Sequence, residues 1–179
     1  MRVAVISDIH GNLPALESVM YDIAKQKVDS IICLGDLIGK GPNSKEVIDI
    51  CRKECEIVVE GNWDDGIYNV YKGNWEMNEK NRWYVNSARP DQLEYLGSLP
   101  HTAEVHINGK LVRLFHAHPN NFNRYFQDSP IEKRLELFEY CDSLSDIAVY
   151  GDIHNAYMQI VQGRCLINAG SVGNPLDIT

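Results

Sequence analysis

The stretch Arg2-Val3-Ala4-Val5-Ile6-Ser7-Asp8-Ile9-His10 decides the fold class of this chain. Its residues 2–7 form a short apolar, β-branched run that is typical of a buried parallel strand, and the polar residues from Asp8 onward end it. Similar runs occur at residues 30–34 and 56–59. Helix patterns separate these runs, because Asn12 can cap one helix and residues 44–52 carry a second. The alternation predicts a β-α-β-α-β unit with a parallel sheet.

The rest of the chain combines helices with antiparallel strands. Residues 60–66, EGNWDDG, predict a polar turn after the third strand, and residues 67–100 predict helices packed over one side of the sheet. Asn108-Gly109 lies between two runs with an apolar period of two, which predicts a β-hairpin over residues 102–115. Four more elements are expected: a helix at 131–140 and strands at 147–150, 157–161 and 164–168. We expect all of them to form one domain, residues 1–179.

Composition excludes several classes of protein. The formal net charge is −8, so the chain has no electrostatic attraction for bulk nucleic acid or an anionic membrane. The N-terminal apolar run is too short for a signal peptide or a membrane span. Five scattered cysteines fit reduced thiols, and we therefore expect a cytoplasmic protein.

Polar side chains that can bind metal follow five of the predicted strands. They lie where each strand ends, and open α/β sheets place their sites at these carboxyl ends. Each motif is a weak signal alone, because an Asp-x-His pair commonly caps a turn. Together, carboxylate, imidazole and amide groups suit Mn²⁺, Fe or Zn²⁺. Seven ligand-type residues are too many for one metal ion, which indicates two: Asp8, His10, Asp36, Asn62, His116, Asp152 and His154.

Six motifs, in order, resemble those of the calcineurin-like metallophosphoesterases, and the likeness is strongest to the small bacterial and archaeal phosphodiesterase branch. They are SDIHGN at 7–12, LGDLIGKGP at 34–42, EGNWD at 60–64, FHAHP at 115–119, YGDIH at 150–154 and NAGSVGNP at 168–175. The resemblance implies an α/β fold, a β-sandwich of two mixed sheets flanked by helices in four layers, α-β-β-α. It extends to the last few residues, where family members usually continue into another strand or two, so a C-terminally truncated chain is also expected.

The resemblance also implies a ligand set. Asp8, His10, Asp36 and His154 would hold the first divalent ion, and Asp36 would bridge to a second. The second would be held by Asn62, His116 and Asp152. In the family, a hydroxide bridging the two metals attacks phosphorus, so Asp36 and Asn62 count as catalytic residues as well. The family usually has His where this chain has Asp152. The additional carboxylate favours manganese over Fe, Zn or Ni, with Mg as a further candidate.

Trp63 is the second departure from the family, which usually has a catalytic histidine there. An indole cannot supply a proton near neutral pH, and loss of a general acid costs about 10²–10⁴ in rate. Three interpretations are open: Trp63 packs a lid, stacks on a substrate ring, or marks a chain that has lost catalysis. We assign Trp63 and Asn12 to substrate binding. His118 either replaces the missing acid or only orients substrate and caps the turn before Pro119.

The sequence therefore predicts a metal-dependent phosphoesterase with an atypical site. Its substrate would be a small phosphodiester or phosphomonoester, and a nucleotide phosphodiester, a dinucleoside polyphosphate and a phosphoprotein are all open. A homo-oligomer is compatible with the sequence. The alternative is a weak or inactive member of the fold that acts as a binding module.

Overall fold

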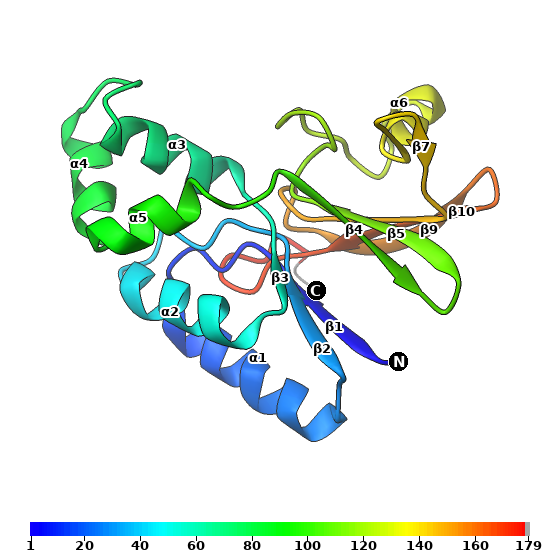
Figure 1. Cartoon of the computed structure of the whole chain (residues 1–179), viewed down its shortest axis with the longest axis horizontal. Helices are drawn as coiled ribbons and strands as arrows, with labels where there is room; N and C mark the ends of the chain where they lie inside the picture. The colour runs from blue at the N-terminus through cyan, green and yellow to red at the C-terminus, as the bar shows by residue number, and fades with distance from the viewer. Residues whose placement is uncertain (178–179) are drawn as a thin grey trace.

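A parallel three-stranded sheet organises the first third of the chain. The computed structural model describes residues 1–177. Strands β1 (Val3–Ile6), β2 (Ser30–Cys33) and β3 (Ile57–Val58) pair in the order β1-β2-β3. Helices α1 (Leu13–Gln26) and α2 (Ser44–Glu54) connect them and pack on one face of the sheet (Figure 1). The predicted parallel β-α-β-α-β unit is confirmed.

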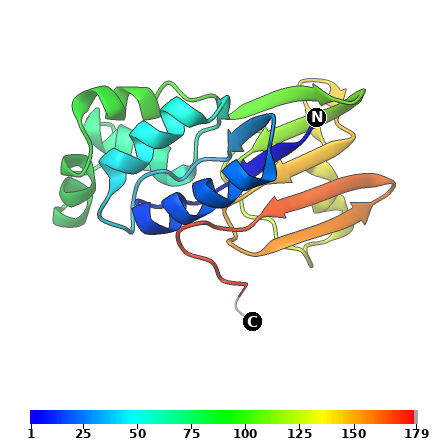
Figure 2. The ribbon, with the colours of Figure 1, turned by 90° about the horizontal axis from the view of Figure 1, so that it is seen from below.

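The segment after β3 corrects the sequence prediction. Instead of a turn through residues 60–66, helix α3 begins at Asn62 and runs to Tyr71. The helix starts there because Asp64, in its first turn, accepts a hydrogen bond from the backbone N–H of Gly61 at 3.0 Å. Helices α4 (Glu79–Asn86) and α5 (Pro90–Leu96) follow and share a core with α1 and α2. The expected helical cover is confirmed, and Figure 2 shows α4 and α5 at one end of the molecule.

A five-stranded mixed sheet forms the second half. Its order is β4-β5-β8-β10-β9, with β8 parallel to β5 and β10 and the other neighbours antiparallel. Asn108 and Gly109 both have positive φ, 50° and 79°, as the predicted hairpin turn requires. The bounds of the strands match the expectations closely: β4 Thr102–Ile107, β5 Lys110–Phe115, β8 Ile147–Tyr150, β9 Ala156–Val161 and β10 Arg164–Ala169.

The predicted helix at 131–140 is too long. Helix α6 ends at Glu136, and a small hairpin of β6 (Glu139–Tyr140) and β7 (Ser143–Leu144) follows. The reason is Arg113 on β5, whose fully buried guanidinium donates hydrogen bonds to the Phe138 carbonyl and to Ser143. These bonds hold the chain across the sheet at the point where the helix would otherwise continue.

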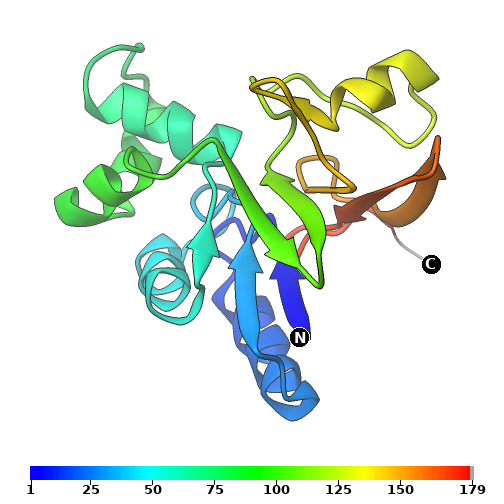
Figure 3. The same ribbon diagram turned by 45° about the vertical axis from the view of Figure 1, so that its right-hand side comes forward.

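The two sheets pack face to face. Figure 3 shows the two sheets as neighbouring layers. The core between them contains Ile32, Leu34, Val112, Leu114 and Val149. A second core lies on the outer face of the five-stranded sheet, under α6 and the segment around Tyr125. The order of layers is therefore helix, sheet, sheet, helix, and the expected α-β-β-α sandwich is confirmed. The strand ends that carry the predicted site face the same edge of this sandwich.

Candidate metal centre

Loops that follow strands β1, β2, β5 and β8, together with the start of α3, bring the seven predicted ligands together. Five of these residues have a left-handed backbone, which non-glycine residues adopt rarely and at a cost of about 1–3 kcal/mol. Their φ angles lie between 50° and 62°: Asp8, His10, Asp36, Asp152 and His154. Backbone strain of this kind clusters at functional sites, where the surrounding structure holds it in place.

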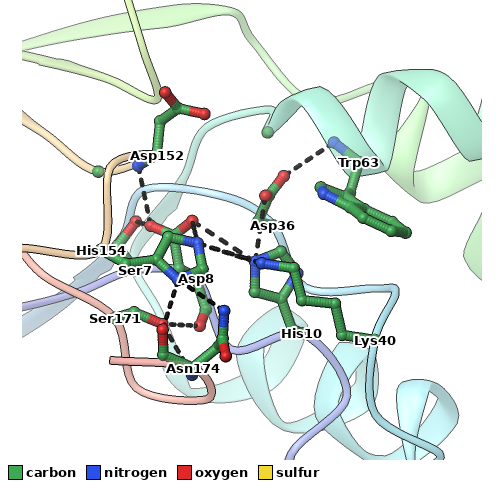
Figure 4. A network of polar contacts seen from close by, with 12 residues as sticks. Ser7, Asp8, His10, Asp36, Lys40, Trp63, Asp152, His154, Ser171 and Asn174 are labelled. Carbon is green, nitrogen blue, oxygen red and sulfur yellow. Dashed lines mark hydrogen bonds and ion pairs between the residues drawn. The ribbon is translucent and has the colours of Figure 1, made fainter. Parts of the chain in front are cut away.

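Asp8 lies at the centre of the cluster. Its Oδ1 is 3.1 Å from His154 Nε2 and 3.7 Å from His10 Nε2 (Figure 4). The same oxygen is 3.9 Å from His116 Nε2. This oxygen is buried and accepts no hydrogen bond from the described part of the chain, whereas Oδ2 accepts hydrogen bonds from Ser7 Oγ and the Asp152 backbone. An unsatisfied buried carboxylate oxygen is costly unless a cation neutralises it. The donor set therefore fits a metal ion.

The cluster divides into two compact groups of ligand atoms, each within 4.8 Å: Asp8 with His10 and His154, and Asp8 with Asp36 and His116. Asp36 Oδ2 lies 3.4 Å from His10 Nε2 and 3.5 Å from His116 Nε2. It thus stands between the imidazoles of the two groups, as a bridging carboxylate would. We call His10 and His154 the first half of the site, and Asn62, His116 and Asp152 the second half.

Backbone carbonyls orient the three imidazoles. Nδ1 of His116 lies 2.7 Å from the Leu34 carbonyl, and Nδ1 of His154 lies 2.5 Å from the Asn174 carbonyl. The corresponding contact of His10, to the Ile38 carbonyl, is longer at 3.4 Å. A neutral ring that donates Nδ1–H to its carbonyl keeps the Nε2 lone pair directed at the cluster, the arrangement that metal-binding histidines use.

Burial and neighbouring charges shift the pKa values of the carboxylates and imidazoles in the cluster. Burial by itself raises the pKa of Asp8, but His116, His154 and Ser7 together lower it to about 2. Burial lowers the pKa of His10 to about 4, so this imidazole is neutral. Burial also acts to lower the pKa of His116, yet Asp36 and Asp8 hold it well above its ordinary value. Neutral imidazole and ionised carboxylate are the forms that bind metal, so a bound cation would replace the proton that these carboxylates favour on His116.

The second half contains Asn62 and Asp152. Asn62 Oδ1 is 3.1 Å from His116 Nε2, at the N-terminus of α3. Asp152 Oδ1 is 3.8 Å from the same nitrogen, and both of its carboxylate oxygens accept hydrogen bonds from Arg124. Burial raises the pKa of Asp152, while His116 and Arg124 oppose this shift. Asp152 is part of neither compact group among the described residues.

Trp63 is packed between neighbours of the site. Its ring meets the rings of His10 and Tyr84 edge to face, with centroids 5.7 and 5.3 Å apart. A Cβ at Gly39, where φ is +94°, would collide with the indole. The backbone N–H of Trp63 donates to Asp36 Oδ1 at 2.8 Å, so the first turn of α3 holds a candidate ligand. These contacts support the packing interpretation of Trp63.

Two predicted residues contribute differently from the ligands. Both ends of the Asn12 side-chain amide are engaged, since Oδ1 accepts from Ala15 N–H and Nδ2 donates to the Gly173 carbonyl. His118 does not extend in line with His116, because β5 ends before both. Its ring stacks on Tyr125 at 5.2 Å, and Nδ1 accepts from the Asn120 N–H. Its Nε2 is buried without a partner in the described chain.

Three residues of the site were not found from the sequence. Asp64 accepts four backbone N–H bonds, from Asp36, Leu37, Ile38 and Gly61, at 2.8–3.3 Å. Burial and the charge of Asp36 raise the pKa of Asp64 to about 7. Lys40 places Nζ 2.8 Å from His10 Nε2 and 3.3 Å from His154 Nε2. Arg124 is the third. Asp64 and Lys40 both lie inside quoted motifs, a signal that could have indicated them, whereas Arg124 lies outside every motif.

The segment at 168–175 braces the first half. Ser171 Oγ donates to the Asp8 carbonyl at 2.8 Å, and the Asn174 carbonyl holds His154. A cleft of about 380 Å³ opens beside it, and Figure 4 shows Lys40 and Trp63 on one side of the cluster and Asp152 on the other. The cleft is lined by His10, Asn12, Pro14, Lys40, Gly41, Pro42, Asn43, Gly173 and Asn174. A larger apolar groove of about 690 Å³ runs between α1 and α2 and includes none of the candidate ligands.

The two-sheet sandwich and the strand-end cluster of carboxylates and imidazoles define a metallohydrolase-type centre. Residues 1–178 match the calcineurin-like phosphoesterase superfamily domain. The chain therefore belongs to this superfamily of metal-dependent hydrolases that act on phosphate esters. No helix among residues 1–177 is long and apolar enough to cross a membrane.

Individual relatives agree with the family. An uncharacterised protein of Methanocaldococcus jannaschii, MJ0912, is 32% identical over 98% of this chain and 77% of its own length. The asymmetrical bis(5'-nucleosyl)-tetraphosphatase PrpE of Oceanobacillus iheyensis is 25% identical over 86% of this chain, which spans 65% of that relative. The crystal structure of a metallophosphoesterase from Sphaerobacter thermophilus has 26% identity and a TM-score of 0.76, covering 99% of this chain and 79% of the other.

Proposed function

We propose that the chain is a dinuclear phosphoesterase that hydrolyses small phosphodiesters or phosphomonoesters of the nucleotide class. The observation that carries the proposal is Asp8 Oδ1, a buried and unsatisfied carboxylate oxygen within 3.9 Å of three imidazole Nε2 atoms. When bound, divalent ions supply the electrophilic charge that activates water and holds phosphoryl oxygens. We propose manganese, because Asp152 makes the donor set richer in oxygen, with Fe, Zn, Ni and Mg as the alternatives to test.

Two overlapping sets of residues would hold the two ions. Asp8, His10, Asp36 and His154 would hold one ion, and Asp36, Asn62, His116 and Asp152 the other. The N-terminus of α3 keeps Asp36 in place through the Trp63 N–H at 2.8 Å. The cleft beside His10 and Lys40 is large enough for a mononucleotide and would receive the substrate. A relative named as a bis(5'-nucleosyl)-tetraphosphatase supports a nucleotide-like substrate.

Leaving-group protonation is the atypical step. The indole of Trp63 cannot protonate a departing oxygen. We therefore propose that good leaving groups, such as aryl oxides and nucleoside phosphates, are preferred, because they depart as anions without a proton. The five free thiols support a reducing compartment, and we infer a cytoplasmic location.

The test uses purified protein with added Mn²⁺. Hydrolysis of bis(p-nitrophenyl) phosphate, p-nitrophenyl phosphate and a bis(5'-nucleosyl) tetraphosphate is measured for the parent and for Asp36→Ala, together with bound metal by elemental analysis. We expect metal-dependent turnover of at least one substrate in the parent and its loss in the variant. Metal binding without any turnover would instead support the binding-module alternative.

A further inference from the structure

Asp152 has an arginine partner that the ligand set does not explain. Arg124 Nε donates to Asp152 Oδ2 at 2.9 Å, and Nη2 donates to Oδ1 at 3.2 Å. This is a two-point guanidinium–carboxylate pair, a geometry that fixes the orientation of the guanidinium plane as well as its position. The carboxylate is buried with only 2% of its side chain exposed, whereas 57% of the Arg124 side chain is exposed. The rigid end of the pair therefore lies in the site and the free end faces solvent.

The free end of Arg124 keeps unused donors. A guanidinium carries five N–H groups, and the Asp152 pair uses one on each of two nitrogens. Nη1 makes no hydrogen bond to residues 1–177 as the structure describes them. The pair also balances charge, because a carboxylate at 152 adds one negative charge relative to the neutral imidazole usual in the family, and Arg124 compensates it. A cation that only balanced charge would not need to remain so accessible.

Arg124 and Lys40 border the cluster from different loops. Arg124 follows β5, and its guanidinium feels the charges of Asp152, Asp36 and Asp8. Lys40 follows β2 and places Nζ 2.8 Å from His10 Nε2, in the first half of the site. An anion approaching the cluster thus meets one cation on each half. Of the two, only the guanidinium offers the planar fork that matches two oxygens of a phosphate.

We propose that Arg124, positioned by Asp152, binds a non-bridging phosphate oxygen of the substrate at the second half of the site. The inference rests on the proposed function and deepens it by naming a specificity residue. A guanidinium contact gains more from a dianionic phosphate than from a monoanionic one. Arg124 therefore favours phosphomonoesters and terminal phosphates over simple diesters, and Asp152 is both a ligand candidate and the anchor of this arginine.

The primary test measures binding of inorganic phosphate to Mn²⁺-loaded protein by calorimetry. Arg124→Ala is expected to weaken phosphate binding by about 10-fold or more, the usual effect of losing a charge-assisted hydrogen bond. Arg124→Lys keeps the positive charge but loses the planar fork, so its phosphate affinity should lie between those of Arg124→Ala and the parent. Lys133→Ala is the matched control, because Lys133 is an exposed cation that pairs with Glu136 on α6, and it should bind phosphate like the parent.

A separate Mn²⁺ titration tells whether Arg124 binds phosphate or only supports Asp152 as a metal ligand. Arg124→Ala should bind Mn²⁺ at least as tightly as the parent, since it removes a positive charge beside the site. Unchanged phosphate binding would overturn the inference, as would a loss of phosphate binding matched by an equal loss of Mn²⁺ binding, or an equal loss in the Lys133→Ala control. Where the protein turns over, the variant should lose more kcat/KM for p-nitrophenyl phosphate than for the diester. If the parent protein binds phosphate through Arg124 but hydrolyses none of the substrates, the proposed function fails and this inference stands.

Discussion

The two halves of the site are built differently, although they share Asp8 and Asp36. In the first half, His10 and His154 are fixed by backbone carbonyls, and the 168–175 segment braces both Asp8 and His154. In the second half, His116 is fixed in the same way, but Asp152 depends on an exposed arginine from a loop. The first half is thus held by backbone groups and borders the cleft, whereas the second half is held in part by an exposed side chain. The proposed substrate cleft therefore lies beside the first half, and the proposed phosphate contact of Arg124 lies in the second.

Removing single ligands gives the largest expected effects. His10→Ala and His116→Ala should each abolish one of two Mn²⁺ binding events in a calorimetric titration, since each imidazole belongs to a different compact group. Asp36→Ala should weaken both events by more than about 100-fold, exceeding the cost of losing an outer-shell partner. A titration in which either histidine variant removes all binding would contradict the two-half description and indicate one shared ion.

Asp64→Asn tests the connection between the halves. The Asp64 carboxylate accepts two backbone N–H groups on each oxygen, tying the Asp36 loop to the start of α3. An asparagine has a single acceptor oxygen, so two of the four buried donors lose their partner. We expect the free energy of unfolding in urea to fall by about 2–4 kcal/mol. Asp65→Asn, in the same helical turn, is the control and should cost less than about 1 kcal/mol. Its carboxylate is half-buried and, among residues 1–177, accepts a hydrogen bond from Asn69 alone.

Trp63→His tests whether a missing general acid limits the rate in the first half, where the indole packs on His10. If a missing acid limits the rate, the variant should increase hydrolysis of alkyl esters about 10-fold more than that of p-nitrophenyl esters. This is a fraction of the ~10²–10⁴ that general acids supply, because the site is not arranged around the new imidazole. Trp63→Phe controls for lost packing against Tyr84. Equal effects on good and poor leaving groups would leave packing as the role of Trp63.

The sequence was sufficient to predict most of the fold and the cluster of ligands. Apolar periodicity located every strand of the two main sheets, and the ordered motifs brought distant residues such as Asp8 and His116 to one edge. Both kinds of signal are local, so they succeed where local preference and tertiary structure agree. The start of α3 at Asn62 was missed because the same polar, glycine-flanked residues suit a turn, and only the contacts of Asp64 decide between them.

The contacts of the second half could not be predicted. The partner of Asp152 is 28 residues earlier, in a loop with no motif, and nothing in the local pattern around Arg124 indicates a functional cation. The end of α6 depended likewise on Arg113, whose hydrogen bonds to residues 138 and 143 span 25 and 30 positions. Pairings of this kind are tertiary, since either side chain alone is equally compatible with a solvated surface position.

The smallest expected effect concerns the loop that carries Arg124. His101 lies 3.0 Å from the His118 carbonyl and 3.2 Å from the Asn121 carbonyl through Nε2, and 3.7 Å from Glu60 through Nδ1. The contact with Glu60 raises the pKa of His101 most, and the two carbonyls add to the shift against the effect of burial. Only the protonated ring can donate from both nitrogens at once. Asp65 and His118 are the other titratable groups that face it.

Because the folded-state pKa is raised, this contribution to stability is fully present below the unfolded pKa of about 6.5 and is lost as pH rises through the folded value. The parent should therefore lose up to about 1 kcal/mol more unfolding free energy than His101→Gln between pH 6 and pH 8.5, measured in urea. Taking the difference between the two proteins cancels the titration of distant groups, and Glu60→Gln should reduce it by weakening the ion pair. Parallel pH curves for parent and His101→Gln would show that the loop of the second half is held without the charge on His101.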